Sequence, residues 1–252
     1  DFLAGLARTS LAEESLLQAG RSKESIAGYL ELHIEQGKRL ERAGIDIGIV
    51  SAIVGYGSYR LSFIGRADHA GSTSMEDRLD AAQGAGAFIL AAREMVMRDF
   101  PNCVANVGKV DFAPGASNIV PARADLLLEF RSPDENQLSR LDIALKELAH
   151  TKAEQFGLKL LIETLGKHLP NLMSVDIQQA FQKSCNVLGL SSTVLASGAI
   201  HDAQSLVDVC PIGMIFVPSV DGASHAPREF TKWEDCVNGA NVLLESVLGL
   251  AG

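Results

Sequence analysis

The chain has 252 residues, of which 47% are hydrophobic, and its 22 Lys and Arg against 31 Asp and Glu give a formal net charge of −9. The apolar content is ample for buried cores in one large or two ordinary domains, and the longest apolar runs are strand-sized, too short to span a membrane. Because the charge is acidic and no basic cluster occurs, we expect neither nucleic acid nor a membrane as a partner.

The first predicted elements are helices. Residues 10–16 favour an amphipathic helix whose polar first turn holds the Glu-Glu pair at 13–14, which we expect to face solvent. A second helix is predicted over residues 23–43, because apolar side chains recur there at helical spacing, and Gly44 is its expected C-cap. This helix would carry His33 on one face.

The next stretch has the element order β-α-β-β-α-β. After a strand at residues 45–53, the Gly-Tyr-Gly at 55–57 marks the start of a second domain. Its predicted elements are a strand at 59–64, a helix at 78–98, strands at 103–112 and 122–131, a helix at 135–156 and a strand at 159–164. This order is the split unit of ferredoxin-like domains.

The last part alternates helices and strands. Its predicted elements are a helix at 175–188, a strand ending near 196, a helix at 201–209, a strand at 212–217 and a helix at 233–248. This alternation predicts an α/β layer with helices flanking a sheet. The first block has too few elements to close such a layer alone. We therefore assign residues 1–57 and 168–252 to one discontinuous α/β domain, with residues 58–167 inserted as a ferredoxin-like domain.

Four segments carry candidate chemistry. ELHIEQG at residues 31–37 and SHAPRE at 224–229 each place a histidine among carboxylates and small residues, a composition that suits a metal site. Taken singly, either histidine is more often a satisfied, partly buried ring. GRADHAGSTSM at 65–75 and ASNIVP at 116–121 lie between them. In this order the segments resemble the amidase/hydantoinase/carbamoylase branch of the M20 metallopeptidase family.

The resemblance implies a metal-binding domain and an inserted lid that also dimerises, so a second copy of the chain is an expected partner. It implies hydrolysis of a small N-carbamoyl or ureido acid, as in N-carbamoyl-L-amino-acid amidohydrolases, allantoate amidohydrolases and β-ureidopropionases. It also implies two divalent ions, Zn, Mn, Co or Ni, with His33 binding one and His225 the other.

Substrate contacts follow from the same resemblance. His69 would reach the metal site of a partner subunit and polarise the substrate carbonyl, where amide hydrolysis builds charge on oxygen. Asn118 and Arg131 would hold the carboxylate end of the substrate. Gln36 would donate to the carbamoyl or amide group, and His201 is a further candidate for substrate binding.

Without the resemblance, several of these residues have ordinary structural interpretations. His69 would more often be a turn histidine, Arg131 half of a surface salt bridge, and His201 a helix N-terminal residue with local hydrogen bonds. Glu31 and Glu35 are expected to face water, as exposed helix carboxylates usually do.

The resemblance covers the C-terminal, larger part of a family member. The family's other ligands, a histidine, a bridging aspartate and a Glu-Glu pair, are expected upstream of residue 1, so the metal would bind this chain weakly or not at all. Our first hypothesis is a binuclear, metal-dependent amidohydrolase. The alternatives are an M20 peptidase or aminoacylase, and a non-catalytic fragment that dimerises and binds small acids.

The cysteines predict a compartment. They lie far apart, without C-x-x-C spacing or a secretory leader, which favours reduced thiols in a cytoplasmic protein. They are Cys103, Cys185, Cys210 and Cys236.

Overall fold

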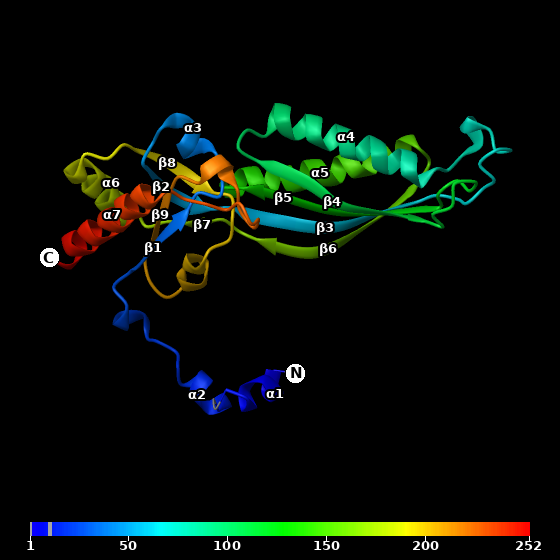
Figure 1. The fold of residues 1–252 in the computed structure, drawn as a ribbon. Coiled ribbons are helices and arrows are strands. Elements are labelled where there is room, and N and C mark those ends of the chain that lie inside the picture. Colours follow the sequence, from blue (N-terminus) through cyan, green and yellow to red (C-terminus); the bar gives the residue numbers. More distant parts are fainter. Residues whose placement is uncertain (1, 10–11) are drawn as a thin grey trace. The chain divides into compact units, whose positions relative to one another are not determined.

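A computed structural model describes residues 2–9 and 12–252 (Figure 1). The chain divides into two compact units. The first comprises the described residues up to Ser51 together with Met173–Leu195 and His201–Gly252, and the second comprises Ala52–Leu172 and Ala196–Ile200. Helices accompany two separate sheets, so the predicted α/β class is confirmed.

The first unit is built on a mixed sheet. β1 (Tyr29–Ile34) lies parallel to β9 (Ile212–Val217), and β9 lies antiparallel to β2 (Ile47–Ile53). β8 (Ser192–Ser197) also pairs with β2. All six residues of β9 are buried, as expected for a central strand with neighbours on both sides.

Two helices, α6 (Val175–Leu188) and α7 (Trp233–Ala251), pack on one face of this sheet. A Cβ atom on Gly213 of β9 would lie only 2.2 Å from Ile177 Cγ2, so glycine is needed where α6 approaches the strand. The buried residues between the helices and the sheet are Ile47, Ile49, Ile177, Phe181, Cys185, Ile215, Val217 and Val242.

The helix predicted over residues 23–43 is wrong. Only a 3-10 turn, η1 (Lys23–Ser25), and the short α3 (Arg39–Ala43) are helical, and β1 lies between them. Every second residue of β1 is apolar, and these residues, Leu30, Leu32 and Ile34, pack against the core below α6 and α7. Burying that face beside β9 stabilises the strand over the helix. Gly44 does end α3 in the left-handed conformation, with φ 62°, as predicted.

The second unit is a four-stranded antiparallel sheet covered by two helices. Its strands are β3 (Gly55–Ile64), β4 (Val104–Ala113), β5 (Arg123–Ser132) and β6 (Lys159–His168), in the order β4-β5-β3-β6. α4 (Ala81–Asp99) and α5 (Glu135–Gln155) enclose the core against one face. The predicted β-α-β-β-α-β element order is therefore confirmed. β7 (Asn171–Leu172) pairs with the last residues of β2.

The remaining elements are short. The predicted helix at 201–209 is only a 3-10 turn, η3. Glu13 and Glu14 are exposed in the first turn of α2, as predicted, whereas Ser10 and Leu11 of that expected helix lie outside the described residues. Across residues 2–9 and 12–252, no helix combines the length and the apolar character that crossing a membrane requires. These elements are α1 (Phe2–Ala7), α2 (Glu13–Leu17), η2 (Met75–Asp77), η3 (Asp202–Leu206) and η4 (Val220–Gly222).

Candidate metal centre

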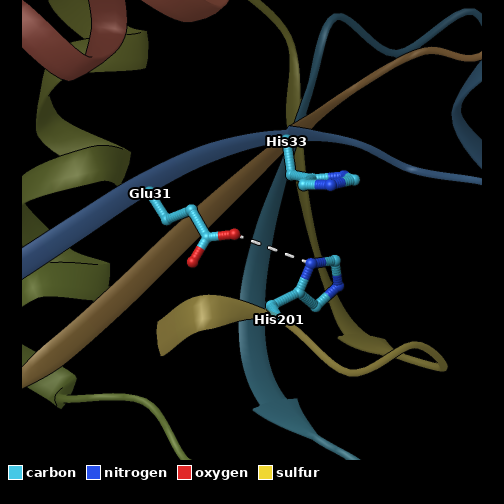
Figure 2. A group of neighbouring side chains, drawn as sticks. All are labelled: Glu31, His33 and His201. Carbon is cyan, nitrogen blue, oxygen red and sulfur yellow. Dashed lines mark ion pairs between the residues drawn. The ribbon is translucent and has the colours of Figure 1, made fainter. Parts of the chain in front are cut away.

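The polar face of β1 carries the candidate metal centre. Because strand side chains alternate, Glu31 and His33 project to the face opposite the one buried under α6 and α7. η3 lies against β1 and β9, and His201 immediately precedes η3. Figure 2 shows the side chains of Glu31, His33 and His201 gathered at this point.

The three side chains offer ligand atoms that all lie within 4.8 Å of one another. The carboxylate Oε1 of Glu31 is 3.7 Å from Nδ1 of His201, as the dashed line in Figure 2 marks. The rings of His33 and His201 meet edge to face, with centroids 4.6 Å apart and planes 72° apart. Among the described residues, no other group of three or more His, Cys, Asp or Glu side chains comes this close.

Hydrogen bonds orient His33 and Glu31. Nδ1 of His33 lies 2.9 Å from the carbonyl oxygen of Ile34. Since a carbonyl only accepts, Nδ1 carries the proton and Nε2 keeps its lone pair, the form in which imidazole binds a metal. Oε2 of Glu31 accepts the backbone N–H of Ala203 at 2.9 Å, which leaves Oε1 turned toward His201.

This donor set suits a divalent transition metal. A carboxylate and two imidazoles are ligands that zinc takes in catalytic sites, where three protein ligands are usual. The sequence prediction of weak or absent binding counted only His33 and His225; because the structure groups three ligands, we expect this chain to bind an ion. Bonds of about 2.1 Å in a tetrahedral arrangement separate ligands by about 3.4 Å. The ligand atoms of Glu31, His33 and His201, all within 4.8 Å of one another, are thus close enough together to be candidates for one ion.

Burial keeps His201 neutral. Its side chain is only 1% exposed. Burial, and then the neighbouring His33, lower the pKa of His201 to about 4, while Asp202 acts in the opposite direction. A neutral imidazole at physiological pH is ready to accept a metal without first losing a proton. Burial, and then the Glu31 carboxylate, raise the pKa of Tyr29 on the same strand face.

For the metal-free chain, we expect the free energy of unfolding to fall as the pH drops from about 6.5 to about 4. The unfolded ring of His201 takes up a proton near 6.5, whereas the folded ring resists protonation until about 4, so the unfolded state binds more protons in this window. The folded and unfolded pKa values of His201 differ by about 2.5, which corresponds to at most about 3.4 kcal/mol of unfolding free energy.

Urea denaturation in the presence of a chelator, across this pH range, measures the effect. His201→Gln removes the titrating ring and should flatten this part of the pH dependence. Equal pH dependence in the two proteins would show that His201 is not responsible.

Two further predicted residues, His225 and Gln36, lie in loops that follow β9 and β1. His225 is exposed and is not one of the three grouped side chains. Both residues have left-handed backbones, with φ 57° at Gln36 and 55° at His225. The Gln36 carboxamide donates from Nε2 to Ser224 Oγ at 3.0 Å, and the His225 N–H donates to Glu229 Oε2 at 2.9 Å.

The second unit brings His69 and Asn118 together. His69 forms a β-bridge with Ile119, and the carbonyl oxygen of Asn118 accepts the N–H of Ala70 at 3.0 Å. Nδ1 of His69 accepts the backbone N–H groups of Gly71 and Ser72, at 3.1 and 3.2 Å. In the neutral ring the proton is therefore on Nε2, which makes this exposed side chain a hydrogen-bond donor.

Arg131, at the end of β5, is already engaged. Its Nε donates to Glu129 Oε1 at 2.8 Å and its Nη1 donates to the carbonyl of Gly198 at 2.6 Å. The pair with Glu129 is partly exposed, at 32% for the Arg131 side chain. Arg131 therefore forms the surface salt bridge that the sequence, without the family resemblance, predicts as its more common role.

Glu31 is the site residue that the sequence prediction missed. It was expected on an exposed helix face, yet its side chain is 12% exposed and lies beside His201. The alternation of Leu30, Leu32 and Ile34 with polar neighbours was the signal for a strand that places Glu31 and His33 on one face. Glu35, also expected to face water, instead accepts the N–H groups that begin α3.

An α/β unit with a carboxylate and two imidazoles gathered on its sheet defines a candidate metal-binding protein. Residues 6–248 match the model of peptidase family M20/M25/M40, and the chain belongs to this family. The predicted family is therefore confirmed, and relatives of the predicted carbamoylase type are among the proteins that this chain resembles.

The N-carbamoyl-L-amino acid amidohydrolase of Geobacillus stearothermophilus is 38% identical over 244 residues, which are 97% of this chain and 59% of that protein. The ureidoglycolate hydrolase of Arabidopsis thaliana is 34% identical over 233 residues, 92% of this chain and 49% of that protein. The crystal structure of a hydantoinase/carbamoylase family amidase from Burkholderia multivorans superimposes with a TM-score of 0.85 at 34% identity, covering 92% of this chain and 56% of the other. The chain thus spans about half to three fifths of the length of these relatives.

Proposed function

We propose that this chain acts in the metal-dependent hydrolysis of a C–N bond in an N-carbamoyl amino acid or a related ureido acid. The observation that carries the proposal is the group formed by Glu31, His33 and His201, a set of ligands for a divalent ion in a chain whose relatives are named for this reaction. The ion would be Zn, Mn, Co or Ni, since imidazole and carboxylate suit all of them.

Glu31, His33 and His201 would hold one ion, which gives His201 a ligand role in place of the substrate contact predicted from the sequence. His225 would bind a second ion of the pair. A bound divalent ion supplies Lewis acidity and lowers the pKa of a water molecule, which produces a nucleophile at neutral pH. The chain's part is to fix the ligands: the Ile34 carbonyl sets the proton on Nδ1 of His33, and the Ala203 N–H holds one oxygen of Glu31.

His69, Asn118 and Arg131 are proposed to bind the substrate. The Nε2–H of His69 would donate to the carbonyl oxygen of the scissile group, which becomes more negative as the tetrahedral intermediate forms. Its support is the pair of backbone N–H groups that fix the tautomer at Nδ1. Arg131 and Asn118 would hold the substrate carboxylate, which requires Arg131 to exchange its bond to Glu129 for a ligand.

We further propose that the inserted domain, residues 58–167, is a lid that pairs with a second copy of the chain, and that residues 1–57 and 168–252 form the metal-binding domain. Exposed apolar side chains support the pairing: Leu90 and Met97 of α4 are 68% and 69% exposed, and Val104 of the edge strand β4 is 59% exposed. Sedimentation should show a dimer, and a strict monomer at high concentration would contradict it. Four unpaired cysteines support a reducing, cytoplasmic location.

Ammonia release from an N-carbamoyl amino acid tests the proposed activity. The chain should release ammonia with Zn²⁺, Mn²⁺, Co²⁺ or Ni²⁺ added, and lose the activity with a chelator or after His33→Ala. A chain that binds metal at this site but never hydrolyses such an acid, with any of these ions, would contradict the proposed reaction.

Arg131→Lys should weaken binding of an N-carbamoyl amino acid about tenfold. Lysine keeps the charge but loses the fork of N–H groups that meets both carboxylate oxygens. Calorimetry with the metal-loaded chain measures the affinity. The matched control is Arg123→Lys, because Arg123 lies on the same strand and pairs with Asp125 in a similar way. Equal affinities for wild type and Arg131→Lys would remove Arg131 from the substrate site.

A further inference from the structure

Hydrogen bonds connect the loops that follow the parallel strands β1 and β9, at the point where the strands end. The N–H of Glu35 donates to the carbonyl of Val217 at 3.0 Å, and the N–H of Gln36 donates to the hydroxyl of buried Ser219 at 3.0 Å. The carboxyl ends of parallel strands are common places for ligands in α/β proteins. These loops carry Gln36 and His225.

Glu229 lies at the centre of the hydrogen bonds that hold these residues. Its Oε2 accepts the backbone N–H of His225 at 2.9 Å and the hydroxyl of Ser224 at 3.0 Å. The Ser224 oxygen in turn accepts Nε2–H of Gln36 at 3.0 Å. One carboxylate therefore connects the backbone of His225 with the side chain of Gln36.

The number of protons on each group decides which group donates and which accepts in the hydrogen bonds that link Gln36, Ser224 and Glu229. A hydroxyl has one proton, and an ionised carboxylate can only accept, so Ser224 donates to Glu229. Ser224 must then accept from Gln36, which places the NH₂ of the carboxamide toward Ser224. The other end, the carbonyl oxygen Oε1 of Gln36, remains as the end that can meet a ligand.

The backbone conformation of Gln36 and His225, the two residues that these hydrogen bonds connect, needs such support. Residues with side chains adopt a left-handed backbone rarely because it is strained, yet Gln36 and His225 both do so. The hydrogen bond that Glu229 Oε2 accepts from the His225 backbone N–H holds one of these two residues directly.

We propose that Glu229 is a positioning residue: it fixes the backbone of His225 directly and, through Ser224, turns the carbonyl oxygen of Gln36 toward the ligand. The proposal rests on the proposed function for its chemical meaning. Under that function, Gln36 Oε1 accepts an N–H of the carbamoyl or ureido group. This acceptor role replaces the donor role predicted from the sequence, because Nε2 of Gln36 already donates to Ser224. The site then selects ligands with a terminal NH₂.

The test is two-dimensional NMR of the metal-free, 252-residue chain, following the backbone amide of His225 and the side-chain amide of Gln36. Glu229→Ala should speed hydrogen exchange at the His225 amide about tenfold, as expected for loss of a charge-assisted hydrogen bond, and should make the Gln36 carboxamide mobile. Glu229→Gln keeps an acceptor oxygen and should stay within about threefold of wild type.

Two more variants separate the steps. Ser224→Ala should release the Gln36 carboxamide while the His225 amide stays protected, and it decides the Gln36 step if Glu229→Ala fails to fold. Glu234→Ala, which removes an exposed glutamate from the first turn of α7, is the matched control and should change neither signal.

Unchanged signals in Glu229→Ala, or a Glu229→Gln chain that behaves like Glu229→Ala, would overturn the positioning role. Because no metal or substrate is present, the result is independent of the proposed activity. A chain that shows these effects but neither binds metal nor hydrolyses ureido acids would overturn the proposed function and leave the role of Glu229 in place.

Discussion

Replacing His33 with Ala should lower the affinity of the chain for Zn²⁺ by at least about 100-fold. Wild type offers three ligand atoms within 4.8 Å, and the variant keeps only Glu31 and His201. Three protein ligands are usual for a catalytic zinc, and even residues that only orient a ligand contribute 10-fold to 100-fold to metal affinity. Isothermal calorimetry at pH 7.5, with a competing chelator, measures both affinities.

The control for that experiment removes a histidine elsewhere. His150 is exposed on α5 of the second unit, so His150→Ala should bind Zn²⁺ like wild type. Glu31→Gln keeps the size of the side chain but removes its charge, and should lose less affinity than His33→Ala. Equal Zn²⁺ affinity in wild type and His33→Ala would mean that the grouped side chains do not form the site.

Asp142→Ala should lower the free energy of unfolding by about 2 to 3 kcal/mol. Asp142 is buried on α5 and accepts hydrogen bonds from Tyr59 at 2.9 Å and Lys167 at 3.0 Å, with Lys146 at 2.8 Å. Removing one partner of a buried ionic network costs about 3 to 5 kcal/mol. The side chains of Lys146 and Lys167 are 37% and 43% exposed and can reach water, which reduces the cost.

Urea denaturation at pH 7 measures this difference, and Asp111→Ala is its control. Asp111 pairs with Lys109, but both side chains are about 60% exposed, so its loss should change the free energy of unfolding by less than about 0.5 kcal/mol. Similar costs for the two variants would contradict a stabilising role of the buried network.

The same network gives a pH dependence of known sign. Burial raises the pKa of Asp142, but the hydrogen bonds from Lys146, Lys167 and Tyr59 outweigh burial and hold it below the usual value. The ionised Asp142 carboxylate therefore makes its full contribution to the free energy of unfolding above pH 4. This contribution is lost as the pH falls through the lowered pKa of Asp142. The difference between wild type and Asp142→Ala should shrink in that acidic range.

The second unit was the easier part to predict from sequence. α4 and α5 are long amphipathic helices, and aspartates at their N-caps, Asp80 and Asp134, accept backbone N–H groups at the first turn. Antiparallel strands β3, β4, β5 and β6 alternate or run apolar between clear turns. Local signals agree with the tertiary structure there, so the element order could be predicted without the contacts.

β1 could not be predicted in the same way, because the apolar residues around it fit both the helical and the strand periodicity. Ile26, Tyr29, Leu30, Ile34 and Leu40 match helical spacing, while Leu30, Leu32 and Ile34 match a strand. The pairing with β9, distant in sequence, decides for the strand. The misplaced helix also turned Glu31 toward water, so one error in secondary structure removed a candidate ligand from the predicted site.

The metal centre depends on contacts that local spacing does not contain. Ala203, which holds Glu31, is 172 positions away from it. The motifs pointed to His33 and His225 through their resemblance to a family, and that family is confirmed. No sequence pattern reveals that His69 has its proton on Nε2 or that Arg131 already contacts Gly198, because both follow from how separate backbone segments meet.

Anomalous diffraction at the zinc edge, from crystals of the chain grown with Zn²⁺, locates the ion directly. The expected result is a peak within about 2.0 to 2.2 Å of a carboxylate oxygen of Glu31 and of one nitrogen each from His33 and His201. A peak elsewhere in the chain, or none at these three side chains at full zinc occupancy in solution, would contradict a metal centre on the polar face of β1.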